Sequence, residues 1–261
     1  MEVLQRPGGE LATRPIHFFW VVDCSGSMYG EKIGIVNNTI QECIPEMRSA
    51  ADNNPNAQLL IRALQFSSGA SWITSSPVPV EDYGWEDMDA NGLTELGKAF
   101  DLLAAQLNIP PMPERALPPV IVLLSDGQPT DDYKKSMDRL KKLPWFRKAV
   151  KIAISIGQDA DDEVLIEFTG NKELVLQANN ATALAKMIKW ASTTASMVSA
   201  PSSKPMNSVS TEATAATAPG TSAVASIPAD DPFAPANNGA PLVLDMSNIP
   251  NPDDFDEGAV W

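Results

Sequence analysis

The chain has 261 residues, 44% hydrophobic and 20% charged, which is enough apolar material for one main domain with a buried core. Its formal net charge of −14 argues against nucleic acid and anionic membrane surfaces as default partners. Two cysteines without Cys-x-x-Cys spacing and a single histidine exclude a structural zinc site. Since the first ten residues do not resemble a signal peptide and no stretch reaches ~18 uninterrupted apolar residues, we expect a cytoplasmic protein without a membrane span.

Composition divides the chain near Ala195. Before this point, apolar segments alternate between strand-like and helix-like patterns; beyond it Ser, Thr, Ala, Pro and Asn dominate. Such a segment has too few large apolar groups to offset the entropy of ordering. The sequence therefore predicts an N-terminal extension over 1–14, a folded domain over 15–195, a disordered linker over 196–239 and an acidic, hydrophobic docking peptide over 240–261.

Short apolar runs bounded by Pro, Gly or Asp predict four strands, over 16–22, 58–66, 119–125 and 149–156. The segment 70–74 follows the second of these at hairpin distance, so we expect it to form an antiparallel edge strand. Residues 174–176 are a candidate for a further edge strand.

Apolar residues at three- and four-residue spacing predict helices between the strands. These helices cover 33–51, 93–107, 133–143, 161–168 and 181–195. Strands alternating with helices indicate an α/β domain with a Rossmann-like, doubly wound, mainly parallel sheet and one antiparallel edge strand, followed by a disordered tail. In such sheets, ligands bind at the carboxyl ends of the strands.

Three oxygen-bearing side chains follow the first predicted strand at every second position: Asp23, Ser25 and Ser27. In an extended segment, alternate side chains point the same way, so these three can converge on one point. One carboxylate and two hydroxyls form a hard-oxygen site suited to Mg²⁺, with Mn²⁺ or Ca²⁺ as alternatives, and poorly suited to zinc or copper. Cys24 falls between the converging positions, and we interpret it as a packed residue rather than a reactive thiol.

Two further residues can reach the same point. Asp126 follows the strand over 119–125, in Leu-Leu-Ser-Asp-Gly-Gln-Pro-Thr-Asp-Asp. Thr94 opens a predicted helix after a glycine-containing loop; it is either an N-cap or an additional hydroxyl ligand.

This combination resembles the metal-ion-dependent adhesion site (MIDAS) of von Willebrand factor A (VWA) domains, which place a first motif after strand one, a threonine before a later helix and an Asp-Gly after strand four. The resemblance covers residues 15 to about 195. It implies that Ser25, Ser27 and Thr94 bind a metal directly or through water, with Asp23 and Asp126 as direct or outer carboxylates.

The residue sequences of the two motifs, Asp-Cys-Ser-Gly-Ser-Met and Ser-Asp-Gly-Gln-Pro-Thr-Asp-Asp, most resemble those of bacterial VWA proteins associated with tellurite resistance and stress. That resemblance implies a cytoplasmic adaptor whose partners include a protein kinase and a protein phosphatase.

Hydroxyl ligands bring no negative charge, so a divalent ion held by them stays electrophilic and can capture a partner's carboxylate. The alternative is a magnesium-dependent phosphatase of the haloacid dehalogenase type, which also places an Asp after a buried strand. Such an enzyme needs a second Asp two residues later, and here that position is Ser25. We therefore expect a non-enzymatic protein.

Two segments are candidates for partner contact. An acidic loop over 80–91 leads to Thr94 and carries Tyr83 and Trp85, which are either aromatic anchors at the rim of the site or packed side chains. The acidity of this loop favours a partner that offers one carboxylate among basic residues. In the tail, Phe255 and Trp261 are candidate anchors of the docking peptide, which we expect to bind another protein rather than its own domain.

Overall fold

The computed structural model describes residues 14–52, 57–157 and 160–199, with the backbone alone for 193–199. Within these ranges, every helix is too short or too polar to cross a membrane. Residues 1–13 of the predicted extension over 1–14, most of the linker and the whole docking peptide, including Phe255 and Trp261, lie outside the described residues. Arg14 belongs to the first strand.

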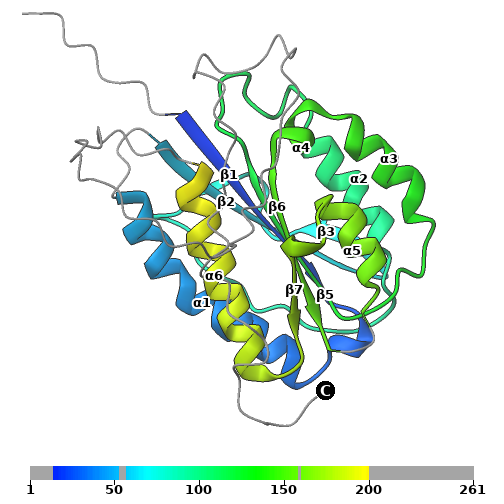
Figure 1. The fold of residues 1–261 in the computed structure, drawn as a ribbon. Helices are drawn as coiled ribbons and strands as arrows, with labels where there is room; N and C mark the ends of the chain where they lie inside the picture. The colour runs from blue at the N-terminus through cyan, green and yellow to red at the C-terminus, as the bar shows by residue number, and fades with distance from the viewer. Residues whose placement is uncertain (1–13, 53–56, 158–159, 200–261) are drawn as a thin grey trace, which may run out of the picture.

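The domain is built on one sheet with the strand order β3-β2-β1-β5-β6-β7 (Figure 1). The strands are β1 (Arg14–Asp23), β2 (Ala57–Ser67), β3 (Gly69–Trp72), β4 (Val78–Pro79), β5 (Val120–Ser125), β6 (Val150–Ile156) and β7 (Val175–Ala178). The neighbours among β2, β1, β5, β6 and β7 run parallel, while β3 and the short β4 pair antiparallel with β2. The predicted α/β class and the antiparallel edge strand are confirmed; β4 was not predicted.

Helices cover both faces of this sheet (Figure 1). They are α1 (Glu31–Asp52), α2 (Leu96–Gln106), α3 (Tyr133–Lys142), α4 (Pro144–Lys148), α5 (Asp162–Thr169) and α6 (Ala181–Ser199). The helices α1 and α6 pack together on one face, and the other four contribute to a second core on the opposite face. Strand β1 is buried on both sides because it is a continuous apolar run: Phe18 and Trp20 face the first core and Phe19 and Val21 the second.

The helices differ from the predictions in several places. Helix α4 was not predicted, and α1 begins at Glu31, two residues before the predicted start. Helix α2 begins at Leu96, so Leu93 lies outside it and is 54% exposed, although its spacing with Leu96 and Phe100 predicted one apolar helix face. The helix cannot extend back to Leu93 because the backbone N–H and C=O of Thr94 are both bonded to Thr130, in the loop after β5. At the other end of the domain, α6 continues to Ser199, four residues beyond the predicted boundary.

Candidate metal site

The candidate site lies where β1 and β5 end side by side. Asp23 is the last residue of β1, and Asp126 directly follows β5. Val22 pairs with Leu124, which brings Asp23 next to Ser125. Because β2 lies on one side of β1 and β5 on the other, this is the point where the strand order reverses, the usual ligand position in open α/β sheets.

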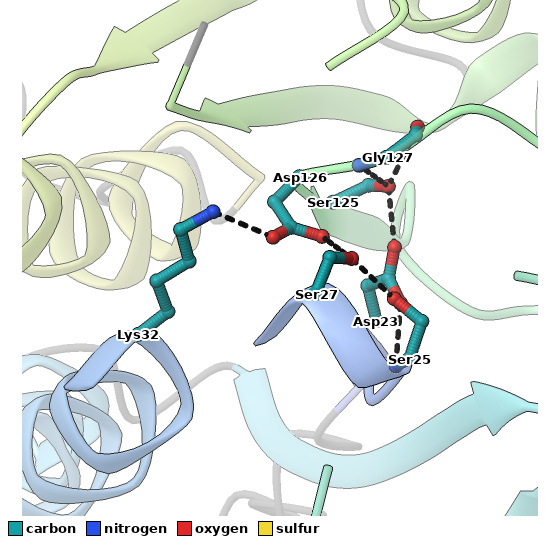
Figure 2. A network of polar contacts seen from close by, with 7 residues as sticks. All are labelled: Asp23, Ser25, Ser27, Lys32, Ser125, Asp126 and Gly127. Atoms are coloured by element: carbon teal, nitrogen blue, oxygen red, sulfur yellow. Dashed lines mark hydrogen bonds and ion pairs between the residues drawn. The ribbon is translucent and has the colours of Figure 1, made fainter. Parts of the chain in front are cut away.

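A chain of hydrogen bonds joins four of the predicted ligands, Asp23, Ser25, Ser27 and Asp126 (Figure 2). The Ser27 hydroxyl donates to Asp126 Oδ1 at 2.7 Å, and Ser25 Oγ lies 3.0 Å from Ser27 Oγ. Since the single Ser27 proton points at Asp126, Ser25 must be the donor in the second contact. Asp23 Oδ1 accepts from the backbone N–H of Ser25 at 2.8 Å, which folds the loop back onto the strand end.

Thr94 reaches the same place from the other side. A methyl group added at Gly127 would lie 3.5 Å from Thr94 Oγ1 and 3.6 Å from Ser27 Oγ. The two hydroxyls therefore line a common space that the hydrogen atom of Gly127 leaves open. All five predicted ligands are thus brought together; Ser27 is exposed to solvent, whereas the other four are buried.

The loop after β5 holds Thr94 in position. The backbone N–H of Thr94 donates to Thr130 Oγ1, and the N–H of Thr130 donates to the Thr94 carbonyl. The Asp131 carboxylate accepts from Gly97 and Lys98 at 3.1 and 3.3 Å, and so caps the first turn of α2. Thr94 itself is therefore not the cap of α2, and its assignment as a metal ligand stays a prediction.

Two contacts to the carboxylates were missed by the sequence analysis (Figure 2). The Ser125 hydroxyl donates to Asp23 Oδ2 at 2.6 Å, and Lys32 Nζ lies 2.7 Å from Asp126 Oδ2. Lys32 belongs to the first turn of α1, where the helix dipole disfavours a cation. A lysine at the start of a helix, directly after a predicted metal loop, is a sequence signal that a carboxylate of the site lies nearby.

Burial leaves Asp23 with an unusual protonation equilibrium. Removal from water raises the pKa of its carboxyl from 3.8 to about 6, and the nearby charge of Asp126 acts in the same direction. The hydrogen bonds from Ser125 and Ser25 act against this shift by favouring the charged form. A cation bound beside this carboxylate would favour ionisation in the same way.

The donor set fits a hard divalent cation. It consists of three neutral hydroxyls and two carboxylates at a partly exposed strand end, so all candidate ligand atoms are oxygens. Three or more His, Cys, Asp or Glu side chains gather nowhere in the part of the chain that the structure describes. Cys24 is buried in the same loop with its thiol 3.7 Å from Met88 Sδ, and burial raises its pKa to about 12, in line with its interpretation as a packed residue.

Tyr83 does not form the predicted rim of the site. It is 2% exposed and belongs to the core beside α1. Arg48 holds the backbone here by donating to the carbonyls of Val80 and Tyr83, which turns the tyrosine inward. The prediction of Tyr83 as a partner anchor is therefore wrong.

Trp85 also serves the fold. It is half-buried against the same core, and its indole N–H donates to Asn37 Oδ1 at 3.1 Å. Asn37 additionally binds both backbone groups of Met88. The acidic loop is thus fixed to α1 by buried polar side chains, and the packed reading of its aromatic residues is correct.

Two exposed side chains with large apolar parts lie in the segments that carry candidate ligands. Tyr29 is 79% exposed and Leu93 is 54% exposed. Tyr29 follows the loop with Ser25 and Ser27, and Leu93 precedes Thr94. A backbone hydrogen bond from Gly26 to the Gly92 carbonyl joins the two segments. We call Tyr29 and Leu93 the apolar flank of the site.

Comparison with protein-family models shows the class of protein that this fold and site define. The model of the von Willebrand factor type A domain matches residues 19–190, two thirds of the chain. The chain therefore belongs to the VWA domain family. A comparison with curated protein sequences gave no match.

Solved structures with the same fold come from distant proteins. The ArnB paralog VWA2 from Sulfolobus acidocaldarius is 17% identical, with a TM-score of 0.51 over 68% of this chain and 45% of that one. A von Willebrand factor type A protein from Catenulispora acidiphila is 14% identical, with a TM-score of 0.51 over 70% and 43%. The chain spans less than half the length of these proteins.

The third example bears on the metal. Proximal thread matrix protein 1 from the mussel byssus, solved with a zinc-occupied MIDAS motif, is 18% identical, with a TM-score of 0.50 over 71% of this chain and 46% of that one. The MIDAS motif of that protein therefore holds zinc, a metal to which the oxygen donors predicted for this chain are poorly suited.

Proposed function

We propose that this protein is a non-enzymatic adaptor that captures a carboxylate of a partner protein at a metal-ion-dependent adhesion site. Asp23, Ser25, Ser27, Thr94 and Asp126 would hold the ion, with Mg²⁺ as the cellular metal. The observation that carries the proposal is the convergence of three hydroxyls and two carboxylates at one strand edge, with Ser27 exposed to solvent.

The chemistry of the donors supports carboxylate capture. A divalent ion held by neutral hydroxyls and few carboxylates retains positive charge and accepts an external acidic side chain. The protein also holds the ligand oxygens in place before an ion binds. The buried carboxylates of Asp23 and Asp126 are fixed by hydrogen bonds to neighbouring residues.

Two groups that a hydrolytic enzyme would need, a histidine base and a second carboxylate after the first strand, are not found at the candidate site. The only histidine of the chain, His17, lies six residues before Asp23 on an extended strand, about 20 Å away. Ser25 stands where a phosphatase of the haloacid dehalogenase type needs its second carboxylate. These features favour binding over phosphoryl transfer.

The surroundings of the site indicate the kind of partner. The apolar flank of Tyr29 and Leu93 offers contact area beside the ligands, while Glu81, Asp82, Glu86 and Asp87 are exposed on the acidic loop. A partner segment with one Asp or Glu next to an apolar side chain, and with basic residues further along, fits both features.

Metal binding is the direct test. Isothermal titration should show one site for Mg²⁺ or Mn²⁺, which Asp23→Ala abolishes while Asp138→Ala, which removes an exposed carboxylate on α3, leaves it intact. Zinc should be titrated in parallel, because the mussel protein holds it. Equal metal affinity in Asp23→Ala and the parent, with both folded by circular dichroism, would contradict the proposal.

The cellular setting rests on the resemblance of the two motifs alone. We propose a cytoplasmic stress-response or phosphosignalling assembly with a protein kinase and a protein phosphatase. Affinity purification with and without a chelator should recover such partners only when the metal is present. Magnesium-dependent hydrolysis of p-nitrophenyl phosphate that Asp23→Asn abolishes would favour the phosphatase alternative.

A further inference from the structure

We infer that Lys32 tunes the metal site: it weakens the hold on the cation and strengthens the hold of the loaded site on a partner's carboxylate. The inference rests on the proposed function and concerns a residue outside the predicted ligand set. It makes Lys32 a specificity-determining residue rather than a ligand.

The ion pair of Lys32 is part of the site itself. Asp126 receives one donor on each oxygen, the Ser27 hydroxyl on Oδ1 and Lys32 Nζ on Oδ2, both at 2.7 Å (Figure 2). The Asp126 side chain is fully buried and that of Lys32 is 17% exposed. The pairs Arg139–Asp101 and Lys141–Glu167, by contrast, are substantially exposed on both partners.

Lys32 is also held in place. It reaches Asp126 from the first turn of α1, and a Cβ added at Gly157, directly after β6, would lie 3.5 Å from its Nζ. The ammonium group is therefore enclosed between the start of one helix and the ends of two strands. It acts as a fixed charge, whereas a surface lysine samples many positions.

The formal charges give opposite effects on the two binding steps. Asp23, Asp126 and Lys32 sum to −1, so a bound divalent ion leaves a site of charge +1. Without the ammonium, the same residues sum to −2, and the loaded site is neutral. Lys32 therefore competes with a cation for Asp126 and repels it, but it attracts an incoming anion once the cation is bound.

A merely structural lysine predicts a different pattern. If Lys32 only kept Asp126 in place, its removal would disorder a ligand, and both metal and carboxylate affinity would fall. Opposite changes in the two affinities distinguish charge tuning from this positioning role.

The test uses the full chain with Mn²⁺ and sodium acetate as probes. Free Mn²⁺ is measured by electron paramagnetic resonance, and displacement of Mn²⁺-bound water by acetate is measured by water-proton relaxation at saturating metal. In Lys32→Gln, which keeps a hydrogen-bond donor without the charge, we expect Mn²⁺ affinity to rise about tenfold and acetate affinity to fall about tenfold. Lys32→Arg should keep both affinities close to the parent values, as should Lys141→Met, which removes a distant ion pair.

Lys32→Met provides a second neutral variant of nearly the same length. It leaves a buried carboxylate without a cation, so its melting temperature should be lower in chelator and rise more than the parent's on addition of Mn²⁺. A fall in both affinities, or no change in either, in folded neutral variants would overturn the inference while leaving the metal site intact. Absence of Mn²⁺ binding by the parent would instead contradict the proposed function.

Discussion

The Ser125 hydroxyl donates a 2.6 Å hydrogen bond to Asp23 Oδ2, joining the last residues of two neighbouring parallel strands. Both side chains are buried, so this bond fixes the carboxylate of a candidate ligand from within the sheet rather than from the loop. The candidate metal site is therefore supported in part by the strand pairing itself.

Ser125→Ala should weaken metal binding about tenfold, because Asp23 loses the partner that orients it and favours its charged form. The free energy of unfolding should fall by about 1–2 kcal/mol. The matched control is Ser155→Ala: Ser155 pairs with Ser125 in the sheet, but its hydroxyl binds Asp162. Calorimetric titration should show that only the first variant loses metal affinity, and equal losses in both would contradict this role of Ser125.

Gly127→Ala should block the site without unfolding the protein. The added methyl would lie at ordinary contact distance from the hydroxyls of Thr94 and Ser27, in the space between them. We expect stability within about 0.5 kcal/mol of the parent and a loss of metal affinity of at least about tenfold. Gly84→Ala, where a methyl would meet nothing within 4 Å, is the control for titration and thermal melting. Unchanged metal affinity in Gly127→Ala would place the cation elsewhere.

Asp131→Ala should reduce both stability and metal affinity. Loss of the cap of α2 should lower the free energy of unfolding by about 1 kcal/mol. The segment with Thr94 would then be attached to the loop after β5 through Thr130 alone, without the bonds from Asp131. Asp161→Ala removes a similar cap from α5, where the carboxylate accepts from Glu163 and Val164. Chemical denaturation should show comparable losses of stability in the two variants, whereas metal titration should show a loss for Asp131→Ala alone.

The apolar flank should affect partner binding but not metal binding. We predict that Tyr29→Ala and Leu93→Ala leave Mn²⁺ affinity unchanged and weaken binding of a labelled peptide with one aspartate between leucine and lysine residues, by about tenfold for the pair. Fluorescence polarisation at saturating Mn²⁺ measures the second effect. Ile109→Ala, which removes another exposed apolar side chain, beyond the far end of α2, is the control. Peptide binding as tight in the double variant as in the control would contradict a role for the flank.

Stability of the metal-free protein should depend weakly on pH between 6.5 and 4, because two buried groups oppose each other. Burial lowers the pKa of His17 from 6.5 to about 4, so in this range the unfolded chain binds a proton that the folded one rejects, and acid destabilises the fold. Burial raises the pKa of Asp23 from 3.8 to about 6, so below pH 6 the folded protein gains a proton first, and acid stabilises the fold.

Single variants should separate the two effects. In His17→Phe, stability should rise on acidification, and in Asp23→Asn it should fall, each by at most about 3 kcal/mol across the window. Urea unfolding in the presence of a chelator at several pH values measures this. Parallel pH profiles for the two variants would contradict the assignment.

The sequence was sufficient to predict the main strands of the sheet and the convergence of most of the candidate ligands. Asp23 and Asp126 could be placed together because both follow continuous apolar runs, and parallel strands end at one edge. Ser25 and Ser27 followed from alternation along an extended loop. Thr94 required the motif resemblance, since a threonine before a helix is commonly a cap.

The features that the sequence did not predict depend on contacts between segments far apart in the chain. Lys32 and Ser125 contact the carboxylates because α1 and β5 pack beside the loop. The cation in the first turn of α1 is a local signal for the first contact, whereas the second has none. Tyr83 looked like a surface aromatic residue within an acidic stretch, but Arg48, far away in the chain, turns its backbone inward. Leu93 matched the helical spacing, and the bonds between Thr94 and Thr130 keep it outside the helix.

The double connection between Thr94 and Thr130 has a consequence for protein engineering. It ties residues 94–98 and 126–131 together, while the loop with Ser25 and Ser27 is a separate segment. The Ser27–Asp126 hydrogen bond connects this loop to the first group, and backbone hydrogen bonds at Asn91 and Gly92 connect it to the segment that leads to Thr94. A graft of this site into a foreign sheet must therefore carry three separate segments in fixed register. Copying the Asp-x-Ser-x-Ser loop alone would transfer Asp23, Ser25 and Ser27 without Thr94 and Asp126, which complete the candidate ligand set.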